Sequence, residues 1–306
     1  MSIKVCFLSW HFQSPELFLQ TLLKMTPNRS GKWQNMEAVT DPFKADFCCV
    51  FDGYSGPMPE DRVIYFGQHP DCCKQSFRRW GDKKALLRLP LDKFLNPGEW
   101  WISHDYDTLI ALQPPAKTKK AICAITYQTH NPMYAQRPLF MAEYFKNYTD
   151  IDLYGRPQER FQADPVLRGV YKGCLGFDKP DGKIGQHLVG KDVLIDYRYS
   201  VEFDVGPTNN FYFSERFYDA LLLWAMPIYF GSESVHIFIP YGSFLYFDAF
   251  RCQDIHRINS VINSDVREQS LPLITQAREL LLNKYQTWPY VYDVVTNINK
   301  YKEMGA

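Results

Sequence analysis

The order of the apolar segments is the feature that most limits what this chain can fold into. Short runs rich in β-branched and aromatic residues alternate with longer stretches whose apolar residues recur at helical spacing. Such alternation is typical of α/β layers, in which helices cover a mainly parallel sheet. In the first half we expect strands over 3–10, 45–53 and 62–67, and a helix over 15–25 that begins after Ser14.

A second α/β series begins near residue 117. The segment ALQPPAKTKK contains adjacent prolines followed by a basic run, 116–120, that we expect to be a solvated linker. At 306 residues the chain is also longer than most single domains. We therefore expect an α/β protein with two Rossmann-like domains, 1–117 and 118–306, which face each other across a cleft. In the second half the expected elements are strands over 121–126, 151–155 and 197–203 and a long terminal helix over 271–288.

Charge and composition argue against several classes of function. The 34 basic residues balance the 34 acidic ones, so a general nucleic-acid or membrane surface is not expected. No stretch approaches the ~18 apolar residues of a membrane span, and the first residues have a strand pattern rather than that of a signal peptide. The eight cysteines lack the spacing of a disulfide framework or a zinc site. Together these features favour reduced thiols and a cytoplasmic location.

The stretch NNFYFSERFYDALLLWAMPIYFG (209–231) places a charged pair at the head of a buried helix. Ser214 is a suitable N-cap for a helix over 215–225, and Pro227 indicates that a strand follows. The free backbone N–H groups at such a helix start favour an anion. Arg216 is unfavourable beside them unless a polyanion such as pyrophosphate binds there. The alternative is that Arg216 only pairs with a neighbouring acid.

The segment 197–250 resembles the donor-binding signature of the α-1,3-fucosyltransferase family. That signature contains Tyr-Val-Thr-Glu-Lys, an apolar helix, and then Pro-(Ile/Val)-Tyr-X-Gly. Here YFSER (212–216) and PIYFG (227–231) take these places, and GSF (242–244) matches the following motif. Weaker similarities to the family extend over LLRLPL (86–91), SHDYD (103–107), AITYQTHNPMYAQR (124–137) and IDLYGRP (151–157).

This resemblance implies an inverting, metal-independent glycosyltransferase of the GT-B type. It would move fucose from GDP-fucose, bound on the second domain, to a glycan hydroxyl presented by the first. Carried over position by position, Arg137 and Arg216 would hold the pyrophosphate. Glu215 would hydrogen-bond to sugar or ribose hydroxyls, and Tyr212 would line the nucleotide pocket. The nucleotide sugar is a co-substrate, so no cofactor is expected.

One departure from the family pattern leaves the donor open. The family's Phe-Glu-Asn element is here Phe203-Asp204-Val205, so the Asn that contacts the nucleotide is missing. Asn209 or Asn210 could take its place. A transferase of the same superfamily with another donor, such as UDP-xylose, is therefore the first alternative.

A second departure concerns the catalytic base. The family's Glu position is occupied by Gln68, and an amide cannot accept the proton of an acceptor hydroxyl. His69 and Asp71 follow closely, and Asp71 is the better candidate because inverting transferases generally use a carboxylate. Loss of the base also supports a further alternative, a glycan- or nucleotide-binding protein without catalytic activity.

Two other features have a structural explanation beside a functional one. Asp105 and Asp107 form an Asp-X-Asp, a spacing that holds a divalent metal in some transferases, but the pattern is common and we predict no metal site. Trp100 and Trp101 could stack on acceptor sugar rings, although burial in the core is the more ordinary role for such residues.

Overall fold

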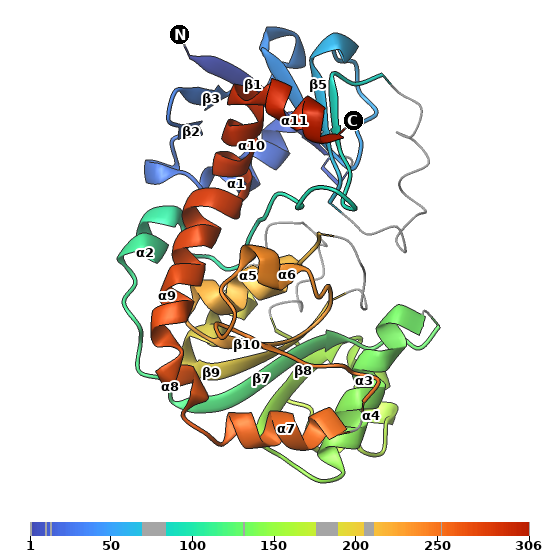
Figure 1. The fold of residues 1–306 in the computed structure, drawn as a ribbon. Coiled ribbons are helices and arrows are strands. Elements are labelled where there is room, and N and C mark those ends of the chain that lie inside the picture. Colours follow the sequence, from blue (N-terminus) through green and yellow to red (C-terminus); the bar gives the residue numbers. More distant parts are fainter. Residues whose placement is uncertain are drawn as a thin grey trace.

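The computed structural model describes residues 2–9, 11–12, 14–68, 84–130, 132–175, 189–204, 211–251 and 253–305. Two sheets form its centre, one above the other in Figure 1. The upper sheet has the strand order β2-β3-β1-β4-β5-β6 and is parallel except for the pairing of β2 with β3. Its strands are β1 (Ile3–Ser9), β2 (Lys32–Trp33), β3 (Met36–Ala38), β4 (Phe47–Phe51), β5 (Val63–Phe66) and β6 (Leu87–Leu89).

The lower sheet has the strand order β11-β10-β9-β7-β8 and is parallel throughout. Its central strands are buried on both faces, which explains why they appear in the sequence as almost continuous apolar runs. The strands predicted from these runs are confirmed. The strands are β7 (Lys119–Thr126), β8 (Ile151–Arg156), β9 (Tyr197–Phe203), β10 (Met226–Phe230) and β11 (Leu245–Tyr246).

Helices cover both sheets, and the two predicted N-caps are confirmed. The Ser14 hydroxyl accepts the Leu17 N–H at 3.4 Å, and the Ser214 hydroxyl accepts the Arg216 N–H at 3.3 Å. None of the described helices is long and apolar enough to cross a membrane. They are α1 (Pro15–Leu23), α2 (Tyr106–Ala111), α3 (Pro132–Phe145), α4 (Gln158–Ala163), α5 (Glu215–Leu222), α6 (Val235–Phe238), α7 (Gln253–Ile262), α8 (Val266–Gln269), α9 (Leu271–Leu280), α10 (Thr287–Thr296) and α11 (Ile298–Gly305).

The terminal helix expected over 271–288 is interrupted. After α9 a π-helical turn, Leu281–Tyr285, leads to Gln286, whose backbone is extended. The Gln286 side chain caps α10 by accepting the Trp288 N–H at 3.0 Å, and it donates to the carbonyl of Met25 at 3.0 Å. The bond to Met25 ties the interruption to the end of the first helix of the chain.

The chain after Gln286 packs against the upper sheet rather than the lower one. Figure 1 shows this red segment, α10 and α11, beside β1 and β5. Trp288 is fully buried there, with its ring against that of Phe7 (centroids 4.9 Å apart) and its indole N–H bonded to the Leu22 carbonyl at 2.9 Å. We expected these terminal helices to pack on the second domain. The domain boundary between residues 117 and 118 stays a prediction.

The loop between β6 and α2, α5 and the junction before α10 meet at Gly98. Its N–H donates to the Tyr285 carbonyl at 3.0 Å, and its carbonyl accepts both the N–H and the hydroxyl of Thr287 at 2.8 Å. A methyl group on Gly98 would lie 2.0 Å from the Tyr218 ring, so no larger residue fits unless this buried ring moves. This contact joins the two halves of the chain directly.

The cysteines that the structure describes are free thiols. Cys6, Cys48, Cys49 and Cys123 are buried, and Cys174 is partly exposed. Burial raises the pKa of Cys6 to about 12 and that of Cys48 to about 11. These thiols are therefore uncharged at neutral pH and act as small apolar core residues.

Replacement of Trp288 tests the contribution of α10 to the upper core. We expect Trp288→Ala to lower the free energy of unfolding by about 3–5 kcal/mol, because it removes a buried ring and leaves a cavity. The measurement is equilibrium unfolding in denaturant. Met304→Ala in α11 is the control, since that side chain is 54% exposed. Equal effects of the two substitutions would show that α10 adds nothing to the core.

Candidate functional site

The start of α5 is fixed at the carboxyl ends of β9 and β10. Asp204, directly after β9, is 2% exposed, and its carboxylate accepts the Ser214 N–H at 2.9 Å and the Tyr229 hydroxyl at 2.7 Å. Burial raises the pKa of Asp204 although these hydrogen bonds oppose the shift. The N-cap residue is thus held by a buried acid from the neighbouring strand. Ligands of parallel α/β sheets bind at this edge.

Arg137 reaches the same place from α3. Its side chain is 1% exposed, its Nη2 donates to the Asp204 carbonyl at 3.2 Å, and its guanidinium lies over the Tyr134 ring at 4.2 Å. In the described part of the chain its Nε has no hydrogen-bond partner and the guanidinium makes no ion pair. Burial and then the charge of Arg216 lower the pKa of Arg137 to about 10, so it is charged at neutral pH.

Arg216 points into the site from the first turn of α5. Its Nη1 lies 4.0 Å from the Glu215 carboxylate, a loose pair that leaves 26% of the side chain exposed. Burial opposes the charge, but the carboxylates of Glu215, Asp204 and Glu202 together raise the pKa of Arg216. Arg216 does pair with its neighbouring acid, as the alternative reading supposed. The loose geometry leaves the guanidinium able to contact an anion as well.

The predicted donor-binding residues that the structure describes come together at this helix start. Tyr212 is buried and lies close enough to affect the pKa of both arginines. Glu215 is held ionised: burial disfavours its charge, but the neighbouring cations lower the pKa of Glu215 to about 2. Asn210 lies outside the described residues, and so do the candidate bases His69 and Asp71.

Sequence reasoning missed two charged residues of the site, Lys191 and Asp219. Asp219 is fully buried in α5; its carboxylate accepts the Lys191 ammonium at 2.7 Å and the Trp101 N–H at 2.7 Å. Lys191 also contacts Glu215 at 3.4 Å, and these two acids raise the pKa of Lys191 against the effect of burial. Asp219 could have been found, since it is the lone charge in 217–226. The sequence around Lys191 contains no comparable pattern that would single it out.

A cavity of about 70 Å³ opens beside these side chains. Its floor is formed by β7, β8 and β9, and its walls by α5, by the turn Val189–Asp196 and by Trp101. Glu215 and Arg216 line it at the helix start. The two tryptophans therefore differ: Trp101 borders the cavity, whereas Trp100 is 1% exposed in the core.

The Asp-X-Asp pair acts in local structure. Asp105 caps α2 by accepting the Thr108 N–H at 3.0 Å, and Asp107 accepts the Asn28 N–H at 2.6 Å. Hydrogen bonds from Thr108, and then the contact with Arg29, lower the pKa of Asp105 to about 2. Within the described ranges no three His, Cys, Asp or Glu residues are placed to hold a metal ion.

Three basic side chains donate hydrogen bonds at the opposite end of α5. The last carbonyls of a helix have no partner within it, and the helix dipole favours positive charge there. Trp224 then turns the chain toward β10 with a φ of 63°. The donors bond to carbonyls of the last turn and of the two residues that follow the helix: Arg278 to Leu221 at 3.3 Å, Lys117 to Leu223 at 2.6 Å, and Arg267 to Trp224 at 3.0 Å.

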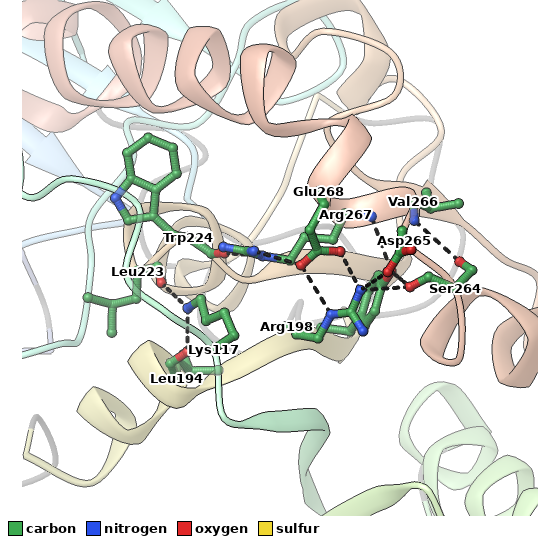
Figure 2. Close-up of polar contacts among 11 residues, drawn as sticks. Lys117, Leu194, Arg198, Leu223, Trp224, Ser264, Asp265, Val266, Arg267 and Glu268 are labelled. Atoms are coloured by element: carbon green, nitrogen blue, oxygen red, sulfur yellow. Dashed lines mark hydrogen bonds and ion pairs between the residues drawn. The ribbon is translucent and has the colours of Figure 1, made fainter.

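Figure 2 shows how two of these side chains, Lys117 and Arg267, are held. Lys117 lies between the carbonyls of Leu223 and Leu194, and Arg267 contacts Glu268 at 3.0 Å. Burial, and then the charge of Arg267, lower the pKa of Lys117 to about 6. The expectation that 116–120 is a solvated linker is therefore wrong for Lys117. The residue is covered because its amine closes the end of α5.

The pH dependence of stability tests this assignment of Lys117. Between the folded pKa of about 6 and the ordinary value of 10.5, the unfolded state binds more protons, so stability rises with pH across that interval. Lys117→Met removes the cost of neutralising the amine. It should raise the Tm at about pH 7 by several degrees, and the gain should shrink toward about pH 10. Lys44→Met is the control, since that side chain is 76% exposed. A gain that does not vary with pH would contradict the assignment.

Comparison with known proteins shows the fold. No protein-family model matches the chain, and no curated protein is similar to it in sequence. A DNA-modifying β-glucosyltransferase, studied with and without uridine diphosphoglucose, has a similar structure: 13% identity, 96% of this chain and 100% of that one covered, and a TM-score of 0.52. An α1,3-fucosyltransferase (14% identity, 99% and 90% covered) and TarM (12% identity, 85% and 50% covered) have TM-scores of 0.42 and 0.43.

At such low identity the first of these likenesses shows the fold alone. Together with the two parallel sheets it confirms the predicted fold class, α/β with two Rossmann-like domains of the GT-B type.

Proposed function

We propose that the protein is a glycosyltransferase that takes a sugar from a nucleoside diphosphate sugar and transfers it to a glycan hydroxyl. The observation that carries this proposal is the pair Arg137 and Arg216 at the start of α5. A buried guanidinium without an ion pair, next to a second cation, is unfavourable unless an anion binds between them. A diphosphate fits this place because it can contact both guanidinium groups and the free N–H groups of the helix.

The same groups explain how departure of the nucleoside diphosphate is catalysed. When the glycosidic bond breaks, the nucleoside diphosphate gains negative charge, and preorganised cations lower the energy of that transition state. Glu215, held ionised by Lys191 and Arg216, is available to accept hydrogen bonds from ribose or sugar hydroxyls. In this proposal the protein itself supplies the positive charge, and the reaction inverts the anomeric carbon.

GDP-fucose is the first choice of donor, on the resemblance of 197–250 to the α-1,3-fucosyltransferases. UDP-xylose, or another UDP-sugar, is the alternative, because Val205 replaces the family's Asn. A protein that binds the nucleotide without transferring the sugar is the second alternative, and hydrolysis of the donor separates it from an enzyme.

Asp71 is our proposed base, with His69 second. Both follow Gln68, which the structure describes at the carboxyl end of β5, where its N–H donates to the Asp52 carboxylate at 2.7 Å. This edge of the upper sheet is where a Rossmann-like domain presents its functional loops. Asp71 can accept the proton of an acceptor hydroxyl as it attacks.

Nucleotide binding and the Arg216 variants test the proposal. GDP or UDP at about a hundred times its Kd should stabilise the fold by about 2.7 kcal/mol, seen as a rise in Tm. Arg216→Ala should remove a charge-assisted contact of roughly 1.5–3 kcal/mol and slow turnover at least about tenfold with the fold intact. Arg216→Lys should retain most activity.

The control for Arg216 is Arg251→Ala, whose side chain is 71% exposed. If no nucleotide raises the Tm of the wild-type protein, the proposed function is wrong. If Arg216→Ala unfolds the protein but binds nucleotide normally, Arg216 has a structural role only.

The base is tested separately. Asp71→Asn should reduce sugar transfer by about 10²–10⁴-fold, because the acceptor hydroxyl is no longer deprotonated. Nucleotide affinity should change by no more than a few-fold, since the donor is bound by the other domain. His69→Ala should have a smaller effect. Wild-type transfer rates in Asp71→Asn would exclude Asp71 and favour His69.

A further inference from the structure

Glu202 is a buried acid that the proposed mechanism does not use. It lies on β9, is 6% exposed, and lines the cavity together with Ser200 from the same face of the strand. The Ser200 hydroxyl donates to one of its carboxylate oxygens. Among the described residues Glu202 has no other hydrogen-bond partner and no ion pair. Buried carboxylates are normally better satisfied than this.

The two cations near Glu202, Lys191 and Arg216, contact other acids instead. Lys191 bonds to Asp219 and Glu215, and Arg216 lies nearest to Glu215. Both cations favour the charge of Glu202, but burial outweighs them and raises the pKa of Glu202 to about 8. Without a ligand Glu202 is therefore mostly protonated at neutral pH, and only one of its oxygens accepts a hydrogen bond, from Ser200.

The rest of the cavity lining is mainly apolar. Ile122 and Ala124 of β7 form its floor beside Glu202, and Leu194 and Trp101 border it. Arg216 lines the same cavity, so one ligand can place a diphosphate at the arginines and extend a second group inward. An aromatic heterocycle with N–H groups on its edge suits these walls and the carboxylate.

The edges of the nucleobases differ in the donors that they offer. Guanine carries two adjacent donors, the N1–H and the 2-amino group, which suit an ionised carboxylate and would favour loss of the Glu202 proton on binding. Uracil has one N–H flanked by two carbonyl oxygens, and those oxygens repel an ionised carboxylate. An ionised Glu202 in this cavity therefore favours guanine over uracil.

We propose that Glu202 is a specificity-determining residue that accepts hydrogen bonds from the guanine of a guanosine diphosphate sugar. This inference rests on the proposed function and deepens it by naming the base of the donor. It also gives a physical reason for guanine recognition in a chain that has Val205 at the position of the family's Asn.

Binding of nucleoside diphosphates to wild type and Glu202→Gln tests the assignment. The Kd values of GDP, inosine diphosphate and UDP are measured by calorimetry. Wild type should bind GDP best, inosine diphosphate more weakly because it lacks the 2-amino group, and UDP weakest. In Glu202→Gln the affinity for GDP should fall about tenfold or more, because the amide N–H₂ faces the guanine donors. UDP affinity should stay within about threefold.

The control is Glu159→Gln, an exposed residue of α4, which should leave all three Kd values unchanged. If wild type binds no nucleotide, the proposed function and this inference both fail. If wild type binds UDP at least as tightly as GDP, this inference fails while the proposed function stands. That comparison needs only the wild-type protein, so it holds even if Glu202→Gln does not fold. An equal loss for GDP and UDP would overturn it too, by placing Glu202 on the ribose or phosphates.

Discussion

Side chains from several distant segments of the chain meet at α5, where they bond to backbone groups at the ends of this helix. A buried helix has unpaired carbonyls at one end and unpaired N–H groups at the other, with about half a charge of opposite sign at each. Here the carbonyl end is closed by Lys117, Arg267 and Arg278, which come from the linker, α8 and α9. At the start of the helix, Arg216 instead lines the cavity in which we propose that a ligand binds.

The first half of the chain is attached to the same helix. The Trp101 N–H bonds to Asp219 inside α5, and Asn96 exchanges two hydrogen bonds of 3.2 Å with the backbone of Phe213 just before it. Gly98 packs against Tyr218 between these contacts. The element proposed to bind the donor is therefore also the element that both halves share. Any shift of α5 on ligand binding would be transmitted to the segment that carries the upper sheet.

Local patterns predicted much of the fold but only part of the site. Strand runs, the caps Ser14 and Ser214, and the helix at 215 follow from short-range chemistry and could be read from sequence. The roles of Lys117 and Lys191 could not, because a lysine in a polar segment appears solvated until the element that covers it is known. Contacts of this kind join residues that are far apart in sequence, and a single sequence contains no record of them.

The return of the chain to the upper sheet has a consequence for biosynthesis. Gln286 and Trp288 bond to the carbonyls of Met25 and Leu22, at sequence separations of 261 and 266 residues. During translation the part of the upper sheet that receives Trp288 lacks this cover until residue 288 has left the ribosome. Closing so long a loop is entropically costly, and contacts of high sequence separation form slowly. The core of the N-terminal half is therefore completed only once the residues around Trp288 are available.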